Sequence, residues 1–98
     1  MEAKSDKKTF VFSESKSYEK FFKAYMSWCK EKGYKPLTKD ANIITLYLTD
    51  LKNGYPKDKP RKPQTLKIKL SAIKKHFEIN NIKTIDFTKF DNTFFENL

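Results

Sequence analysis

Hydrophobic residues recur along this chain at spacings of three and four positions, the pattern of helices that bury one face. One such stripe lies within residues 15–32 and consists of Tyr18, Phe21, Phe22, Tyr25, Trp28 and Cys29. Ser15 or Ser17 can cap the start of this helix, and Gly33 is a typical stop. A second stripe, over about residues 39–52, consists of Ile43, Ile44, Tyr47, Leu48 and Leu51. The β-branched residues in this second stripe permit a strand, but its length and spacing favour a helix capped by Thr38 or Asp40.

Prolines and a glycine separate these two helices from the second half of the chain. Residues 53–63 contain three prolines and one glycine, which predicts a loop. A third helix is expected over about residues 63–80, with Pro63 in its first turn. Its core stripe is Leu66, Leu70, Ile73 and Phe77. From residue 88 a fourth helix is expected, with Phe90, Phe94 and Leu98 on one side. Because this pattern still runs at Leu98, we expect the domain to continue beyond it.

These patterns predict an all-α fold, a small orthogonal bundle of four helices. Only two of the 98 residues are glycine and 15% are aromatic, which suits a helical chain with one modest core. Residues 1–12 are polar and basic and are expected to form a flexible tail, from which Phe10 and Phe12 can dock on the domain. Residues 13–98 are expected to form the single domain.

The charge of the chain is concentrated in one segment. The net charge is +9, and residues 57–75 hold eight basic residues against one acid. Such a surplus favours a polyanionic partner, nucleic acid first and an anionic membrane surface second. No apolar run approaches membrane-spanning length, and the N-terminus lacks the apolar centre of a signal peptide. No helix combines a basic face with an exposed apolar one, so we expect no membrane partner.

The third helix keeps its polar residues on a sector separate from its core stripe. About a quarter to a third of a turn away lie Gln64, Lys67, Ser71, Lys74 and Lys75, whereas Lys69 and His76 flank the stripe on its other side. A solvated lysine face is the ordinary alternative, but the concentration of charge favours phosphate contacts. Gln64 or Ser71 could then touch base edges in a major groove. Because most aromatic residues belong to the core stripes, duplex DNA is favoured over single strands.

Catalytic residues are scarce. The chain has one histidine, one arginine and one cysteine, which excludes an internal disulfide and the usual metal sites. Cys29 and His76 could in principle form a nucleophile–base pair. However, Cys29 lies on the core stripe, which favours a buried structural thiol, and His76 is expected to be a partly exposed helix residue. We therefore expect no catalysis, no cofactor and no small-molecule substrate for these residues.

Several short motifs occur in a characteristic order. They are Trp28-Cys29-Lys30, Pro36-Leu37, Tyr47-Leu48 with Leu51, Gln64-Thr65-Leu66, Leu70-Ser71-Ala72-Ile73 and His76. In this order, over about residues 15–80, the chain resembles the N-terminal core-binding domain of the tyrosine recombinase, or phage integrase, family. The resemblance implies a helical bundle that clamps one face of duplex DNA, opposite a catalytic domain. It also implies that two helices present residues to the major groove, and the matching positions here are Lys16, Ser17, Gln64, Lys67 and Ile68.

The chain departs from that family pattern at Ile68 and in the loop of residues 56–62, which is longer than the tight turn of the simplest relatives. Ile68 stands where a polar residue would suit a DNA-facing position better. The family's chemistry also needs a tyrosine nucleophile with a set of arginine, lysine and histidine residues, which one arginine cannot supply. The resemblance therefore implies either that a catalytic domain follows this chain or that the domain serves DNA binding alone.

The combined prediction is an intracellular, DNA-associated protein, in the nucleus of a eukaryote or the cytoplasm or nucleoid of a bacterium or phage. Its partner would be double-stranded DNA, on which several copies can meet. The candidate DNA-binding residues are Lys16, Ser17, Lys57, Lys59, Arg61, Lys62, Gln64, Lys67, Ser71, Lys74 and Lys75. The alternative is a helical protein–protein interaction module whose lysines keep it soluble.

Overall fold

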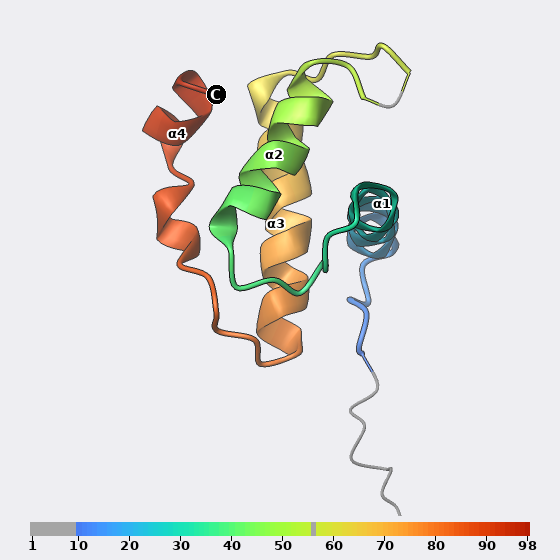
Figure 1. Ribbon diagram of the computed structural model, residues 1–98. Coiled ribbons are helices and arrows are strands. Elements are labelled where there is room, and N and C mark those ends of the chain that lie inside the picture. The colour runs from blue at the N-terminus through green and yellow to red at the C-terminus, as the bar shows by residue number, and fades with distance from the viewer. Residues whose placement is uncertain (1–9, 56) are drawn as a thin grey trace, which may run out of the picture.

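The computed structural model describes residues 10–55 and 57–98, and the regular elements in these residues are all helical (Figure 1). The α-helices are α1 (Lys16–Lys32), α2 (Ala41–Lys52), α3 (Pro63–Ile79) and α4 (Asn92–Glu96). A short 3-10 helix, η2 (Phe87–Lys89), precedes α4. Figure 1 shows α1 end-on while α2 and α3 run lengthwise, so α1 crosses them at a steep angle. The predicted all-α orthogonal bundle is confirmed.

Capping residues fix the helix ends close to the predicted positions. At the start of α1 the Ser15 hydroxyl accepts a hydrogen bond from the Tyr18 N–H at 3.3 Å. Gly33 ends this helix in the left-handed conformation, with φ of 82°. At the start of α2, Asp40 Oδ1 accepts from the Asn42 N–H at 2.9 Å. These caps join residues only a few positions apart, which is why the sequence pattern located them.

Most residues of the predicted stripes form the core, with α1 and α2 both packed against α3, whereas Tyr18 and Phe21 lie outside it and are half-buried. The residues that are fully buried or nearly so include Phe22, Tyr25, Trp28, Cys29, Ile44, Tyr47, Leu48, Leu51, Leu66, Leu70, Ile73 and Phe77. The Trp28 indole N–H donates to Asp50 Oδ2 at 2.8 Å, which ties α1 to α2. The prediction of Cys29 as a buried thiol is confirmed, and burial raises its pKa to about 11.

The prediction of one continuous fourth helix from residue 88 is wrong. Asp91 lies inside the expected helix, and its Oδ1 accepts from the Phe94 N–H at 3.0 Å and begins α4. Before it, Asp86 Oδ1 accepts from the Thr88 N–H at 3.0 Å and begins the short η2. Such local side-chain bonds compete with the helical ladder. Because the helix restarts at Asn92, Phe95 becomes a core residue beside the expected Phe90.

The segment before α1 packs on the bundle. Residues 1–9, the greater part of the expected tail, lie outside the described residues. The Phe10 ring stacks on the Phe22 ring with their centroids 5.3 Å apart, and the Phe12 ring meets Phe10 edge-on at 5.0 Å. Asn80 binds the backbone of Val11 on both sides, accepting from its N–H at 2.8 Å and donating to its carbonyl at 2.9 Å. The expected docking of both phenylalanines is confirmed.

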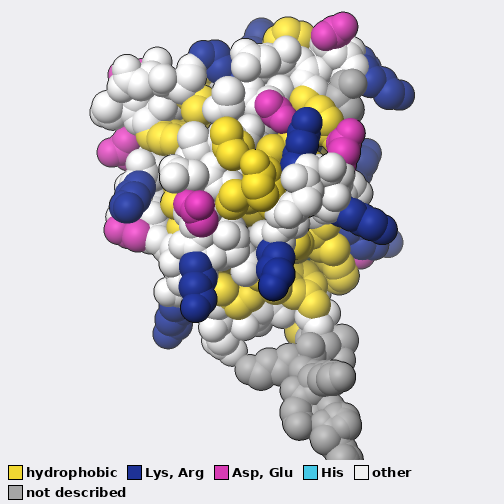
Figure 2. All heavy atoms as spheres, in the orientation of Figure 1, with side chains coloured by type: hydrophobic (Ala, Val, Ile, Leu, Met, Phe, Trp, Pro, Cys, Tyr) yellow, Lys and Arg dark blue, Asp and Glu magenta, His cyan; other side chains and the backbone are white. Residues whose placement is uncertain are grey.

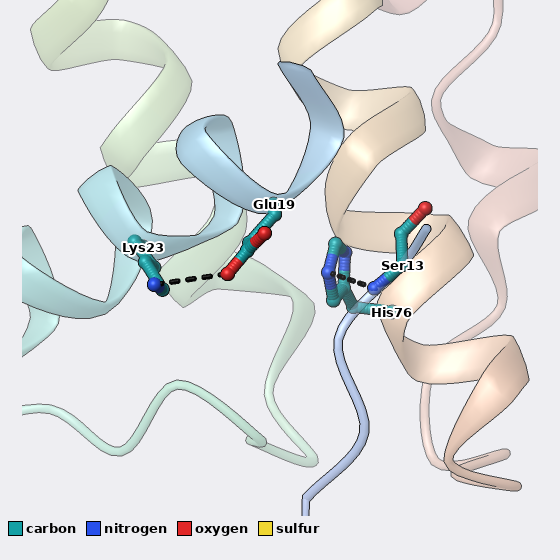
Figure 3. Close-up of polar contacts among 4 residues, drawn as sticks. All are labelled: Ser13, Glu19, Lys23 and His76. Carbon is teal, nitrogen blue, oxygen red and sulfur yellow. Dashed lines mark hydrogen bonds and ion pairs between the residues drawn. The ribbon is translucent and has the colours of Figure 1, made fainter. Parts of the chain in front are cut away.

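His76 is fully buried, so the prediction of a partly exposed histidine is wrong. Its Nε2 accepts a hydrogen bond from the Ser13 N–H at 3.1 Å (Figure 3), and its Nδ1–H donates to the Ala72 carbonyl at 2.7 Å. Its ring stacks on Phe22 at 4.4 Å. His76 lies beside the core stripe of α3, and α1 together with the N-terminal segment closes over that flank. The histidine is therefore a packing residue.

Candidate nucleic-acid interface

The basic loop between α2 and α3 is compact and folds back on the end of α2. Gly54 has φ of 111°, and its carbonyl accepts from the Lys59 N–H at 2.8 Å. A Cβ atom at this position would lie 3.0 Å from the Asp58 Cα, so both conformation and space favour glycine. The Arg61 guanidinium donates to the Tyr55 carbonyl at 3.1 Å and also to the Lys59 carbonyl. Arg61 therefore orders the loop.

Tyr55 connects this loop to α1. Its hydroxyl donates to Glu31 Oε1 at 2.6 Å, and this hydrogen bond to a carboxylate raises the pKa of Tyr55 to about 12. The loop lysines Lys57, Lys59 and Lys62 are exposed. The loop thus presents three lysines from a backbone that is held at both α1 and α2.

Lys69 lies between α3 and α1, half-buried. Its Nζ is 3.7 Å from the centroid of the Phe21 ring, a close cation–π contact. Burial, and then the neighbouring charges of Arg61 and Lys20, lower the pKa of Lys69. Arg61 and Lys69 line the same hollow, of about 360 Å³, together with Ser27 and Tyr55. We call Lys69 and the two cations that lower its pKa, Arg61 and Lys20, the cationic cluster. Like charges held together in this way favour a bound anion.

Lys20 and Lys69 were not among the candidates chosen from the sequence. Lys69 was visible as a lysine that flanks the core stripe of the third helix, whereas Lys20 lies on the polar side of the first helix, away from its stripe. Their convergence depends on the crossing of α1 over α3, which a helical wheel of either helix alone does not contain. Ser17, which was a candidate, lies one turn before Phe21 on the same flank of α1. Lys16 is exposed in the first turn of α1.

The candidates on α3 are exposed, but they face different neighbours. Lys67, Ser71 and Lys74 border a hollow of about 210 Å³ against η2 and α4. Lys67 Nζ donates to Asn92 Oδ1 at 2.8 Å and lies 5.7 Å from the centroid of the Phe95 ring, so α4 holds this lysine.

The remaining α3 candidates lie apart from that hollow. Lys75 borders a different hollow, which the N-terminal segment helps to line. Gln64 is exposed in the first turn of α3, next to the loop. The candidate residues of α3 share one sector of a helical wheel, but in the structure they therefore lie on separate parts of the protein surface.

Acidic partners are scarce near these lysines. Within residues 10–55 and 57–98, one ion pair forms, between Glu19 and Lys23 at 2.9 Å (Figure 3). The loop lysines and the cationic cluster have no ion pair with a described acid. The face over α2 differs, because Figure 2 shows hydrophobic side chains at its centre with lysines and acids interspersed around them. The positive charges of the loop and the cluster are thus available to an external anion.

No helix in residues 10–55 and 57–98 has both the length and the apolar character needed to cross a membrane. Comparison with known proteins gives no match, whether to a family, to a curated protein or to a solved structure.

Proposed function

We propose that this domain binds double-stranded DNA through a surface formed by the cationic cluster, the loop lysines and the first turns of α1 and α3. The observation that carries the proposal is the hollow shared by Arg61 and Lys69, in which neither cation forms an ion pair with a described acid, beside the exposed lysines of the loop. A phosphate placed there would offset the mutual repulsion of these cations and favour the charged form of Lys69.

The proposed surface offers groups that can contact the phosphates of DNA and groups that can contact its base edges. Lysines and the compact loop suit phosphate contacts, which orient a protein on a duplex without reading its sequence. Gln64, exposed beside the loop, carries the amide that pairs with an adenine edge in the major groove. The crossing of α1 and α3 supports the same proposal, because the recombinase core-binding domains that the sequence resembles present two helices to the major groove. In this proposal the domain is the DNA-clamping part of such a protein and has no catalysis of its own.

The test is the affinity for a labelled duplex, measured by fluorescence anisotropy over a range of salt concentrations. If about five phosphates are neutralised, the logarithm of the binding constant falls with the logarithm of salt with a slope of roughly −4 to −5. Lys20→Glu and Lys62→Glu should each weaken binding and reduce that slope by about one or more.

Lys83→Glu is the matched control, because it makes the same charge change beyond the other end of α3. Seventeen helical residues span about 25 Å, which exceeds the screening length of roughly 10 Å at 0.1 M salt. The control should therefore change affinity much less than Lys62→Glu. An absence of duplex binding at low salt, or an equal loss in Lys83→Glu and Lys62→Glu, would refute the proposed surface.

One observation favours the second candidate, a protein interaction module. Ile68 is 49% exposed in the middle of the polar face of α3, where an apolar side chain suits a protein partner. Under this alternative, duplex affinity is absent at low salt and Lys62→Glu changes nothing in the DNA titration. The same anisotropy series therefore distinguishes the two functions.

A further inference from the structure

A groove runs along the side of α1 opposite Phe21. It has a volume of about 630 Å³ and lies between α1, the N-terminal segment and the connector from α1 to α2. Its floor includes the side chains of Phe12, Met26 and Tyr34, and its rim carries Lys23, Lys30 and Lys35. We call this the α1 groove. None of the functions considered above uses it.

The floor of the α1 groove is held in place by the fold. The Tyr34 ring lies 5.6 Å from the Trp28 ring, and the Tyr34 N–H donates to the Cys29 carbonyl at 2.8 Å. The connector is fixed at Pro36, whose carbonyl accepts from the Tyr25 hydroxyl at 2.9 Å. A partner would therefore meet a largely preformed hydrophobic surface, which reduces the entropy lost on binding.

The charged residues that line the α1 groove are all basic. Lys30 and Lys35 are exposed and form no ion pair with a described acid, whereas Lys23 pairs with Glu19. Lys23 and Lys30 are seven residues apart on α1, which places them two turns, or about 10.5 Å, apart along the helix axis. Because Lys23 is paired with Glu19, the cations open to acidic side chains of a partner are Lys30 and Lys35.

We propose that the α1 groove binds an acidic, partly hydrophobic peptide segment of a partner protein. Hydrophobic side chains of the segment would cover Met26 and Phe12, while its carboxylates would meet Lys30 and Lys35. A nucleic-acid strand fits this groove less well, since one of its two aromatic rings, Phe12, is partly buried against Phe10, which leaves Tyr34, 37% exposed, as the ring open to a base. The groove borders the hollow of Arg61 and Lys69 at Ser27, but no residue of the cationic cluster lines the groove, so this inference does not rest on DNA binding.

The probe is a short labelled peptide in which leucine and phenylalanine alternate with aspartate, titrated into the protein and followed by two-dimensional amide NMR. The expected shifts are at Met26, Lys30, Tyr34 and Lys35, with α3 unchanged. A second peptide, with serine in place of aspartate, tests whether binding needs the carboxylates. A third, with serine in place of the hydrophobic residues, tests whether binding needs contacts with the hydrophobic floor of the groove. Both should bind at least tenfold more weakly.

The double variant Lys30→Glu, Lys35→Glu alters exposed side chains only and should lower affinity for the acidic peptide by tenfold or more. Lys62→Glu is the matched control: it should keep peptide binding even where it weakens DNA binding. The proposal is overturned if the peptide shifts map to the loop and α3, if the serine-for-aspartate peptide binds equally well, or if duplex DNA shifts the groove residues and competes with the peptide. Failure of DNA binding in the anisotropy test leaves these expectations unchanged.

Discussion

The buried imidazole of His76 provides a stringent test of the packing of the N-terminal segment. Two substitutions separate its roles. His76→Ala removes both the ring and its hydrogen bonds, whereas His76→Phe keeps a flat ring beside both Phe22, 4.4 Å away, and Phe10, 6.1 Å away. The phenylalanine variant loses the acceptor for the Ser13 N–H. The Ala72 carbonyl keeps its helical hydrogen bond from the backbone N–H of residue 76.

The two substitutions should lower the free energy of unfolding by measurably different amounts. Truncating a fully buried aromatic ring to alanine costs about 3–5 kcal/mol, because the removed atoms leave a cavity between the remaining rings. Leaving the partly buried Ser13 N–H without an acceptor costs about 1–2 kcal/mol. His76→Phe should therefore keep most of the stability that His76→Ala loses. For a domain of this size, each kcal/mol corresponds to a shift of roughly 4–8 °C in Tm.

Urea unfolding followed by the fluorescence of Trp28, the only tryptophan, gives both free energies of unfolding. Hydrogen exchange of the Ser13 amide reports the lost hydrogen bond directly and should be faster in both variants. Lys75→Ala, an exposed neighbour on α3, is the control and should change stability by no more than about 0.5 kcal/mol. Equal destabilisation by His76→Phe and His76→Ala would show that ring packing contributes little. No effect of either would refute the docking of the N-terminal segment.

Two further predictions concern titratable groups. Because burial raises the pKa of Cys29 from 9.0 to about 11, its thiolate fraction at neutral pH falls about a hundredfold, and the thiol should react with an aromatic disulfide reagent at least about a hundredfold more slowly in the folded protein than in urea; equal rates would contradict its burial. The pKa of Tyr55 is raised from 10.0 to about 12 by Glu31, so this hydrogen bond stabilises the fold fully below pH 10 and is lost as the pH rises through about 12. In a tyrosinate absorbance titration, Glu31→Gln should shift one tyrosine to lower pH, and an unchanged curve would count against the contact.

The sequence by itself determined the helices and most of the core. Periodicity, the caps Ser15 and Asp40 and the stop at Gly33 depend on residues within a few positions of one another, so they can be read along the chain. The concentration of basic residues in the loop and α3 is also a property of the sequence. The exception is the C-terminal region, where aspartate caps interrupt a helix that the hydrophobic pattern alone would continue.

The tertiary structure determined which neighbours each polar residue contacts and which polar residues are buried. His76 is buried because α1 and the N-terminal segment cover one flank of α3, and Lys69 is half-buried against Phe21 for the same reason. The lysines of α3 share one sector on a helical wheel, yet α4 holds Lys67 while Lys75 lies beside the N-terminal segment. These relations depend on the packing of segments far apart in the sequence. A helical wheel describes only one helix and cannot contain them.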